Sequence, residues 1–183
     1  MIIAFEGIDR SGKSTQAALL CEKLKKEGLP ARLITSPSDT DFGNYIRNQR
    51  SQFITQEAIF LMHVADFYEQ LIKTKEEEII IFDRYVDSCY SSMIHQGLDY
   101  KWIKQVTKEL KTPDLIFLMD LNEEKCLERE IEDEADADLE WQKSKREYYD
   151  TIKNKEEVIV VNALQDIEKI ATFIYETTRN QLG

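Results

Sequence analysis

Residues 7–14 constrain the fold of this chain more than any other part of the sequence. They read GIDRSGKS and satisfy the pattern GxxxxGK followed by Ser or Thr. An apolar run at residues 2–5 precedes them, and apolar residues recur at helical spacing in the segment that follows. The sequence therefore predicts a strand, a glycine-bearing loop and a helix. Such a loop wraps a phosphate with its backbone N–H groups, and the positive end of the helix dipole adds to the attraction.

Lys13 and Ser14 are the two side chains of this loop with a predicted chemical role. The Lys13 ammonium is expected to reach the β- and γ-phosphates of a nucleotide, and the Ser14 hydroxyl is expected to bind Mg²⁺. The competing interpretation is a glycine turn before an ordinary helix. The strand and the helix on either side argue against it, so we predict a nucleotide site at this loop.

A second candidate feature follows the strand expected at residues 78–82. Its run of four apolar residues shows no polar alternation, as expected of a strand covered on both faces of a parallel sheet. We expect the same of the apolar runs at residues 115–119 and 158–161. Asp83 directly follows residues 78–82, like the acidic residue that binds magnesium at a Walker B strand. A helix cap is the other interpretation of Asp83, and the two roles are compatible. Arg84 lies at the carboxyl edge of the sheet, where its guanidinium suits a second phosphate better than a surface salt bridge.

The rest of the chain alternates between apolar runs and amphipathic stretches. The expected strands are residues 2–5, 31–35, 78–82, 115–119 and 158–161. The expected helices are residues 14–27, 40–47, 55–73, 88–95, 100–111, 123 to about 147, and 166–179. Strands that alternate with helices indicate an α/β sheet with helices on both faces. No repeat or flexible linker interrupts the chain, so we expect one domain over residues 1–183.

The composition argues against several classes of protein. The 183 residues carry 24 basic and 35 acidic side chains, a formal net charge of −11, which disfavours a nucleic-acid polymer as the main partner. No apolar run approaches the ~18 residues of a membrane helix, and no leader sequence is recognisable. The three cysteines are far apart and lack the spacing of a zinc site, so we expect reduced thiols in a cytoplasmic protein.

Four segments resemble the thymidylate kinase family, which passes a phosphoryl group from ATP to dTMP. They are FEGIDRSGKSTQ at residues 5–16, PSDTDFGNYIR at 37–47, DRY at 83–85 and PDLIFLMDLNEEKCLER at 113–129. The second is similar to the family's PGGTPLGxxIR and the fourth to its PDLxxxLDxxxxxxLxR. The resemblance implies a P-loop NTPase fold, a three-layer α/β/α sandwich with a central parallel sheet of about five strands. It implies the strand order second, third, first, fourth, fifth. It also implies ATP, Mg²⁺, small-molecule nucleotides as partners, and a homodimer.

The resemblance assigns roles to the residues in and around the loop. It implies that nine consecutive residues hold ATP: Gly7, Ile8, Asp9, Arg10, Ser11, Gly12, Lys13, Ser14 and Thr15. Arg84 would grip the acceptor phosphate, and Asp9 and Asp83 would surround the magnesium and the transferring group. Family members place the arginine that stabilises the transition state either in this loop or in a lid, here about residues 128–142. The lid has no arginine after Arg129, so Arg10 is the better candidate. The expected catalytic residues are Arg10, Lys13, Asp9 and Arg84.

The expected acceptor site departs from the family. The family's Asp-Arg pair on the helix that lines the base is Asp66-Phe67 here, and its aromatic residue four positions before Phe67 is His63. His63 and Phe67 lie at i and i+4, where they would either stack against a pyrimidine or line the core. Arg47 is a further candidate for binding the acceptor phosphate.

Two more positions of this region differ from the family. The asparagine expected after the DRY segment is Cys89, and the aromatic residue that crowds a ribose 2′-OH is Ser92. The resemblance favours dTMP as the acceptor, with dUMP, another deoxynucleoside monophosphate or a deoxynucleoside as alternatives. A nucleotide-binding protein without transfer activity is the alternative from a different class, and the intact residues of the loop argue against it.

Overall fold

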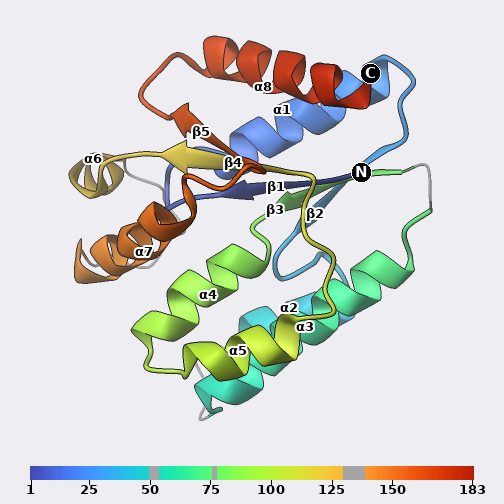
Figure 1. Cartoon of the computed structure of the whole chain (residues 1–183). Helices are drawn as coiled ribbons and strands as arrows, with labels where there is room; N and C mark the ends of the chain where they lie inside the picture. Colours follow the sequence, from blue (N-terminus) through green and yellow to red (C-terminus); the bar gives the residue numbers. More distant parts are fainter. Residues whose placement is uncertain (50–53, 76–77, 130–138) are drawn as a thin grey trace.

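The structure, a computed structural model, describes residues 1–49, 54–75, 78–129 and 139–183. Its centre is a sheet of five parallel strands in the order β2-β3-β1-β4-β5 (Figure 1). The strands are β1 (Ile2–Glu6), β2 (Ala31–Thr35), β3 (Ile79–Asp83), β4 (Leu115–Asp120) and β5 (Val158–Asn162). All five match strands expected from the sequence, and their order is the one that the resemblance implies.

The three inner strands carry the core of the protein. Every residue of β1 and β3 is buried, and in β4 only the last residue, Asp120, is exposed. Continuous apolar runs are expected where helices cover both faces of a sheet. The same expectation for residues 158–161 is wrong, because β5 is an edge strand: Val160 is 44% exposed and Ile159 is half-buried. An apolar run therefore does not distinguish an inner strand from an edge strand.

Helices cover both faces of the sheet (Figure 1). On one face, α1 (Lys13–Lys26) packs against α8 (Ile167–Leu182). The other face carries the helices that connect β2 to β4, and there α4 (Val86–His95) packs against α7 (Leu139–Ile152). The remaining helices are α2 (Asp41–Gln49), α3 (Gln56–Ile72), α5 (Tyr100–Thr107) and α6 (Glu123–Glu128). The arrangement is the expected three-layer α/β/α sandwich.

The stretch expected as one helix from residue 123 to about 147 is divided in the structure. α6 ends at Glu128, and the backbone of Arg129 is extended, with φ −87° and ψ 100°. α7 begins at Leu139 and continues to Ile152. The prediction of a single helix is therefore wrong. The expected lid, about residues 128–142, includes the end of α6 and the first turn of α7, and its residues 130–138 lie outside the described residues.

The carboxyl ends of the strands meet at one edge of the sheet, and this edge positions the loop. β1 ends in Glu6, directly before the loop, and Phe5 pairs with Asp83 at the end of β3. The backbone of Gly7 passes close to β4, where a Cβ atom would lie 2.6 Å from the Met119 carbonyl oxygen. Only glycine fits this approach, because any other residue would displace the loop. The start of the loop is therefore fixed against the neighbouring strand.

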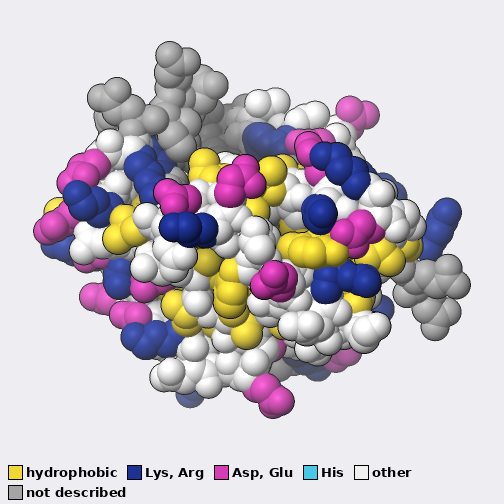
Figure 2. Space-filling model, turned by 90° about the horizontal axis from the view of Figure 1, so that it is seen from above, with side chains coloured by type: hydrophobic (Ala, Val, Ile, Leu, Met, Phe, Trp, Pro, Cys, Tyr) yellow, Lys and Arg dark blue, Asp and Glu magenta, His cyan; other side chains and the backbone are white. Residues whose placement is uncertain are grey.

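The face formed by α1 and α8 has a mixed surface (Figure 2). Lys and Arg side chains are interspersed with Asp and Glu across it, and apolar side chains lie between them. Such a mixture of signs is typical of a solvated surface. Among the helices in the described parts of the chain, none is long and apolar enough to cross a membrane.

Candidate active site

The loop between β1 and α1 holds the Lys13 side chain against its own backbone. Gly12 is the N-cap of α1 and has a left-handed backbone with φ 92°, and Arg10 is left-handed as well, with φ 56°. The Lys13 ammonium donates to the Ile8 carbonyl oxygen and, at 3.2 Å, to Ser11 Oγ. Burial is the main cause that lowers the pKa of Lys13 to about 7. Phosphate oxygens would favour the charged form again, so this lysine is suited to receiving an anion.

A cavity of about 450 Å³ opens beside this loop. Residues from the loop, from the strand ends and from the segment after β5 line it: Arg10, Ser11, Gly12, Lys13, Ser14, Thr15, Gln16, Arg84, Met119, Arg129, Ala163, Gln165, Ile167 and Ile170. Ser14 and Thr15 are exposed, whereas Lys13 is buried. The size is typical of small-molecule sites, and the basic residues of the lining suit an anionic ligand.

Asp83 ends β3 next to the loop and has an unsatisfied carboxylate oxygen. The residue is buried, and its Oδ1 has no hydrogen-bond partner among the described residues. Asp83 is not the cap of α4: the N-cap is Tyr85, and Glu6 accepts the N–H groups of Tyr85 and Ser88. A buried oxygen without a partner is costly, and magnesium takes oxygen ligands. Asp83 therefore has the chemistry expected of a magnesium ligand.

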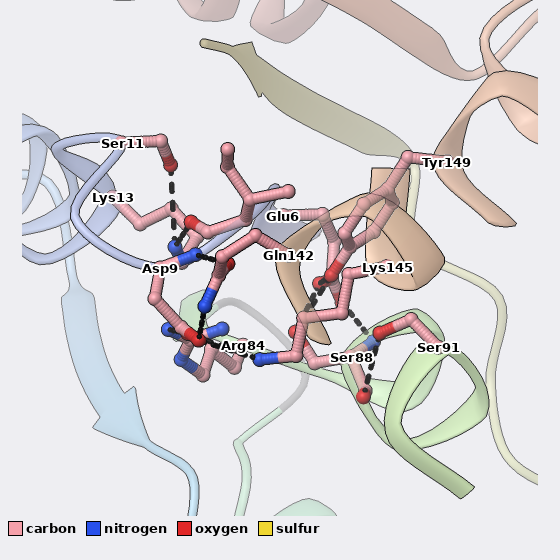
Figure 3. Close-up of polar contacts among 11 residues, drawn as sticks. Glu6, Asp9, Ser11, Lys13, Arg84, Ser88, Ser91, Gln142, Lys145 and Tyr149 are labelled. Atoms are coloured by element: carbon pink, nitrogen blue, oxygen red, sulfur yellow. Dashed lines mark hydrogen bonds and ion pairs between the residues drawn. The ribbon is translucent and has the colours of Figure 1, made fainter. Parts of the chain in front are cut away.

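Asp9 joins three segments of the chain through its carboxylate (Figure 3). Arg84 Nη2 donates to its Oδ1 at 2.5 Å. Lys145 and Gln142, both from α7, donate to its Oδ2 at 2.8 Å and 2.7 Å. Burial opposes ionisation, but the positive charges of Arg84 and Lys145 hold the pKa of Asp9 well below its usual range. Asp9 is therefore ionised at neutral pH and ties Arg84 to the loop.

Glu6 connects the end of β1 to α4 and α7. Its Oε1 accepts the N–H groups of Tyr85 at 2.9 Å and Ser88 at 3.2 Å, and its Oε2 accepts the hydroxyl of Ser88 and, at 3.0 Å, that of Tyr149. Burial, together with the nearby carboxylate of Asp87, raises the pKa of Glu6 to about 7. The start of α4, directly after Arg84, is thus held by a buried carboxyl group.

The turn between β2 and α2 is attached to α3 by Asp66. This residue is 1% exposed, and it accepts the Ser38 N–H at 2.8 Å and the Ser38 hydroxyl at 2.6 Å. Gly43 of α2 lies against the same turn, where a Cβ atom would be 1.9 Å from the Ser38 carbonyl oxygen. The turn, α2 and α3 therefore form one packed unit that excludes any side chain at position 43.

Arg47 of α2 also contacts this turn. Its Nη2 donates to the Pro37 carbonyl oxygen at 2.7 Å and pairs with Asp39 at 2.8 Å, and its Nη1 donates to Asn44 at 2.6 Å. Arg47 thus holds the turn together, and its contact with an acceptor phosphate stays a prediction.

His63 and Phe67 lie on the buried side of α3. His63 Nδ1 is 3.4 Å from Ser36 Oγ, beside the same turn. Phe67 is 2% exposed and packs edge-on against Phe82 and Tyr85, with ring centroids 5.9 Å and 4.8 Å apart. This aromatic cluster favours the packing interpretation that the sequence left open for Phe67. The role of both residues in binding a base stays a prediction.

Several residues of the site have no role in the sequence-based prediction: Glu6, Asp66, Arg129, Gln142 and Lys145. Gln142 and Lys145 lie at i and i+3 on the buried face of a helix, and polar residues at such positions are the signal that could have found them. Arg129 donates to the carbonyl oxygens of Arg10 at 2.9 Å and Ala163 at 2.8 Å. It lines the cavity because it leaves the helical path.

The fold and the site together define a class of protein. A parallel strand leads through a glycine-bearing loop into a helix, and β3, the strand beside it in the sheet, ends in the buried Asp83. This is the arrangement of P-loop nucleotide-binding proteins.

Comparison with known proteins places the chain within that class. Residues 5–174 match the thymidylate kinase family. A Thermococcus onnurineus protein named "Probable thymidylate kinase" is 37% identical, over 100% of this chain and 98% of that protein. Proteins of the same name from Thermococcus kodakarensis and Methanobrevibacter smithii are 34% and 33% identical, over 100% of this chain and 99% and 96% of theirs. The chain belongs to the thymidylate kinase family. It is a nucleoside monophosphate kinase, and therefore a transferase with nucleotide substrates.

Proposed function

We propose that the protein transfers the γ-phosphoryl group of ATP to dTMP and forms ADP and dTDP. The main support is the buried ammonium of Lys13 beside a cavity of about 450 Å³ that Arg10 and Arg84 also line. Cations from the loop and from the end of β3 thus meet in one cavity, which suits a polyphosphate donor beside a second phosphate. The family and the names of the relatives support dTMP as the acceptor.

Residues 7–15 form the proposed donor site. Lys13 exchanges its contacts with Ile8 and Ser11 for phosphate oxygens, and the N–H groups at the start of α1 surround the phosphates. Ser14 and Asp83 are the proposed magnesium ligands. No group of three or more His, Cys, Asp or Glu side chains in the described segments could hold a metal, so phosphate and water oxygens complete the coordination. When bound, the ion neutralises charge on the phosphates.

Arg10 is the proposed residue for stabilising the transition state. It lines the cavity together with Lys13 and Arg84, and its left-handed backbone belongs to the loop itself. Charge spreads over the γ-phosphoryl oxygens during transfer, and a guanidinium that meets it contributes a factor of about 10³ or more in rate. Residues 130–142 contain no arginine, which leaves the loop as the source.

Arg84 is the proposed residue for holding the acceptor phosphate, and Asp9 orients it through the contact of 2.5 Å. Arg47 and His63, which surround the turn after β2, are the other proposed acceptor residues. Phe67 takes part indirectly, since it packs against Tyr85, the residue after Arg84.

A different acceptor is the second candidate. Phe67 is 2% exposed, so its ring offers little surface to a thymine base. A site that lacks this stacking surface would accept dUMP, another deoxynucleoside monophosphate or a deoxynucleoside with the same phosphate chemistry.

The test is ADP formation from ATP and Mg²⁺ with dTMP, dUMP, dCMP, dGMP, UMP and thymidine offered one at a time. We expect the highest kcat/KM with dTMP. A higher kcat/KM with another acceptor would show that this acceptor, and not dTMP, is the preferred substrate. ATP binding without acceptor-dependent ADP formation would contradict transfer and favour a nucleotide-binding protein without activity.

We also propose one kinase domain over residues 1–183, located in the cytoplasm. All five strands belong to one sheet, and all three cysteines are buried, as suits a reducing compartment. A fusion of the chain to a fluorescent protein that localises outside the cytoplasm would contradict the second part.

A homodimer is the proposed assembly, by analogy with the resembled family. α3 carries an exposed apolar stripe at i, i+4, i+7 and i+11, formed by Leu61, Ala65, Tyr68 and Ile72, and Ile72 is 84% exposed. We expect light scattering to give twice the chain mass of 21.5 kDa and Tyr68→Glu to give a monomer. A monomeric wild type would contradict the assembly.

A further inference from the structure

The face of α7 that is turned toward the phosphate loop carries two buried polar side chains, Gln142 and Lys145 (Figure 3). They lie at i and i+3 and are 0% and 5% exposed. A buried helix face is ordinarily apolar, and burying an ammonium is costly unless it is paired. Two such residues side by side indicate a function that apolar side chains could not perform.

Both side chains reach Asp9 in the loop. Gln142 Oε1 accepts the Asp9 N–H at 3.0 Å, and Gln142 Nε2 donates to Oδ2 at 2.7 Å. Lys145 Nζ contacts Oδ1 at 3.1 Å and Oδ2 at 2.8 Å. The Trp141 ring, with its centroid 4.8 Å from the same Nζ, lies along the lysine. The backbone and the carboxylate of Asp9 are therefore both fixed by α7.

Asp9 in turn fixes Arg84. Arg84 Nη2 donates at 2.5 Å to Oδ1, the same oxygen that Lys145 contacts at 3.1 Å. The backbone of Arg84 is left-handed, with φ 70°, and its N–H donates to the Phe5 carbonyl oxygen at 3.1 Å. With the backbone held in this way, the position of the guanidinium depends on Asp9. A chain of contacts thus runs from α7 through Asp9 to Arg84.

After Arg129, the first basic side chain that contacts the loop is Lys145 of α7, which binds Asp9. Residues 130–142 contain neither lysine nor arginine. Lys143, the first basic residue of α7, is exposed and pairs with Glu140 at 3.3 Å. Lys143 and Lys145 therefore belong to one helix, two positions apart, and differ in whether they reach the site.

We infer that Lys145, together with Gln142, is a positioning residue for the acceptor half of the reaction. It holds the Asp9 carboxylate in the orientation in which Arg84 meets the acceptor phosphate. This role rests on the proposed function, because Arg84 is taken to bind that phosphate. It differs from a purely structural ion pair because its loss weakens the use of the acceptor more than the binding of ATP.

The test compares Lys145→Met with Lys143→Met, a matched loss of charge two positions away. For Lys145→Met, we expect kcat/KM for the acceptor to fall about 10- to 100-fold, because a buried charge-assisted contact is lost. The Kd for ATP, measured by calorimetry, should stay within about twofold of the wild type. Lys143→Met should change neither quantity by more than about twofold, since an exposed ion pair contributes little.

Two further variants separate positioning from folding. Lys145→Arg keeps the charge and should recover kcat/KM to within about fivefold of the wild type. Lys145→Met added to Asp9→Asn should cost no more than Asp9→Asn alone, because both changes act through one carboxylate. A thermal melt on each protein shows whether it is folded.

An acceptor kcat/KM within twofold of the wild type for Lys145→Met would overturn the inference. Equal losses for ATP binding and acceptor use, with a lowered Tm and no recovery in Lys145→Arg, would also overturn it and leave a structural ion pair. The wild type alone tests the proposed function, since absence of acceptor-dependent ADP formation there contradicts transfer before any variant is compared.

Discussion

Contacts between residues close in the sequence hold the donor side of this site, whereas contacts between residues far apart in the sequence hold the acceptor side. Lys13 is positioned by Ile8 and Ser11, five and two residues away. On the acceptor side, Asp66 holds Ser38 across 28 positions, and Lys145 holds the carboxylate of Asp9, the partner of Arg84, across 136. A short motif can specify the first arrangement, whereas the second exists only after distant elements have packed. Substitutions on distant helices are therefore expected to change acceptor use and leave the donor loop intact.

The largest effect is expected on the donor side, where the contacts are local in the sequence. Lys13→Met removes the ammonium that meets the transferring phosphates, so kcat should fall about 10³-fold. Stability should not fall, because burial already lowers the pKa of Lys13 to about 7 and thus disfavours its charged form. Steady-state kinetics and a thermal melt check both parts. The control is Lys23→Met, an exposed position on the same helix. A Lys13→Met variant that keeps more than a tenth of the wild-type kcat would contradict a catalytic role for this loop.

Arg84→Lys should give the next largest effect and separate the two sides. Lysine keeps the charge but loses the planar fork that binds both Asp9 and a phosphate, so kcat/KM for the acceptor should fall about 10²-fold. The Kd for ATP should remain within about threefold of the wild type. Calorimetry and initial rates measure the two quantities, with Arg146→Lys on α7 as the control. If ATP binding falls as far as acceptor use, Arg84 belongs to the donor side.

Asp66→Asn tests whether the long-range contact shapes the acceptor side. Asparagine replaces one of the two oxygens that accept from Ser38 with an NH2 donor, so the free energy of unfolding should fall by about 1–2 kcal/mol. Acceptor kcat/KM should fall about tenfold, because the turn after β2 loses its attachment to α3. Denaturant unfolding and initial rates measure these changes, and Glu69→Gln on the same helix is the control. Unchanged acceptor kinetics in a destabilised protein would make Asp66 purely structural.

The smallest effect on activity is expected at Glu6, which lies between the two sides. Its pKa rises from 4.5 to about 7 on folding, so its stabilising contribution is fully present below pH 4.5 and is lost as the pH rises through about 7. Glu6→Gln stays neutral, so relative to the wild type it should gain up to about 3 kcal/mol over that pH range.

Unfolding free energies at pH 4.5, 6 and 8 check this prediction at Glu6. The kcat at pH 8 should remain within about twofold of the wild type, because Glu6 lines neither phosphate site. A stability difference that does not vary with pH would contradict the raised pKa.

The sequence predicts the sheet and the loop because both depend on local patterns. The strands are short apolar runs, and residues 7–14 carry their own glycines and lysine. The break between α6 and α7 has no glycine or proline at Arg129 to announce it. Where α6 ends, the Arg129 guanidinium binds the carbonyl oxygens of Arg10 and Ala163, both distant in the sequence. A contact of this kind is decided by tertiary structure and overrides local helix propensity.

The acceptor side shows the same limit. In the sequence, Asp66 stands out only because it matches the aspartate of the family's Asp-Arg pair. Its contact with Ser38 follows from the packing of α2 and α3. Phe67 lies on the face of α3 that its spacing indicates, but periodicity does not distinguish a ring that meets a ligand from one that meets Phe82. The spacing of Gln142 and Lys145 places both on one helix face, but their contact with Asp9 follows only from the tertiary structure.

Phosphoryl transfer is tested most directly with ATP that carries a radioactive γ-phosphate. The reaction contains Mg²⁺, with dTMP as the only acceptor, and chromatography separates the labelled products. We predict that the label appears in dTDP at the rate at which ADP forms, and that Lys13→Met lowers this rate about 10³-fold. Label that appears only in inorganic phosphate, or ADP formation that does not depend on dTMP, would contradict phosphoryl transfer between the two sides of the site.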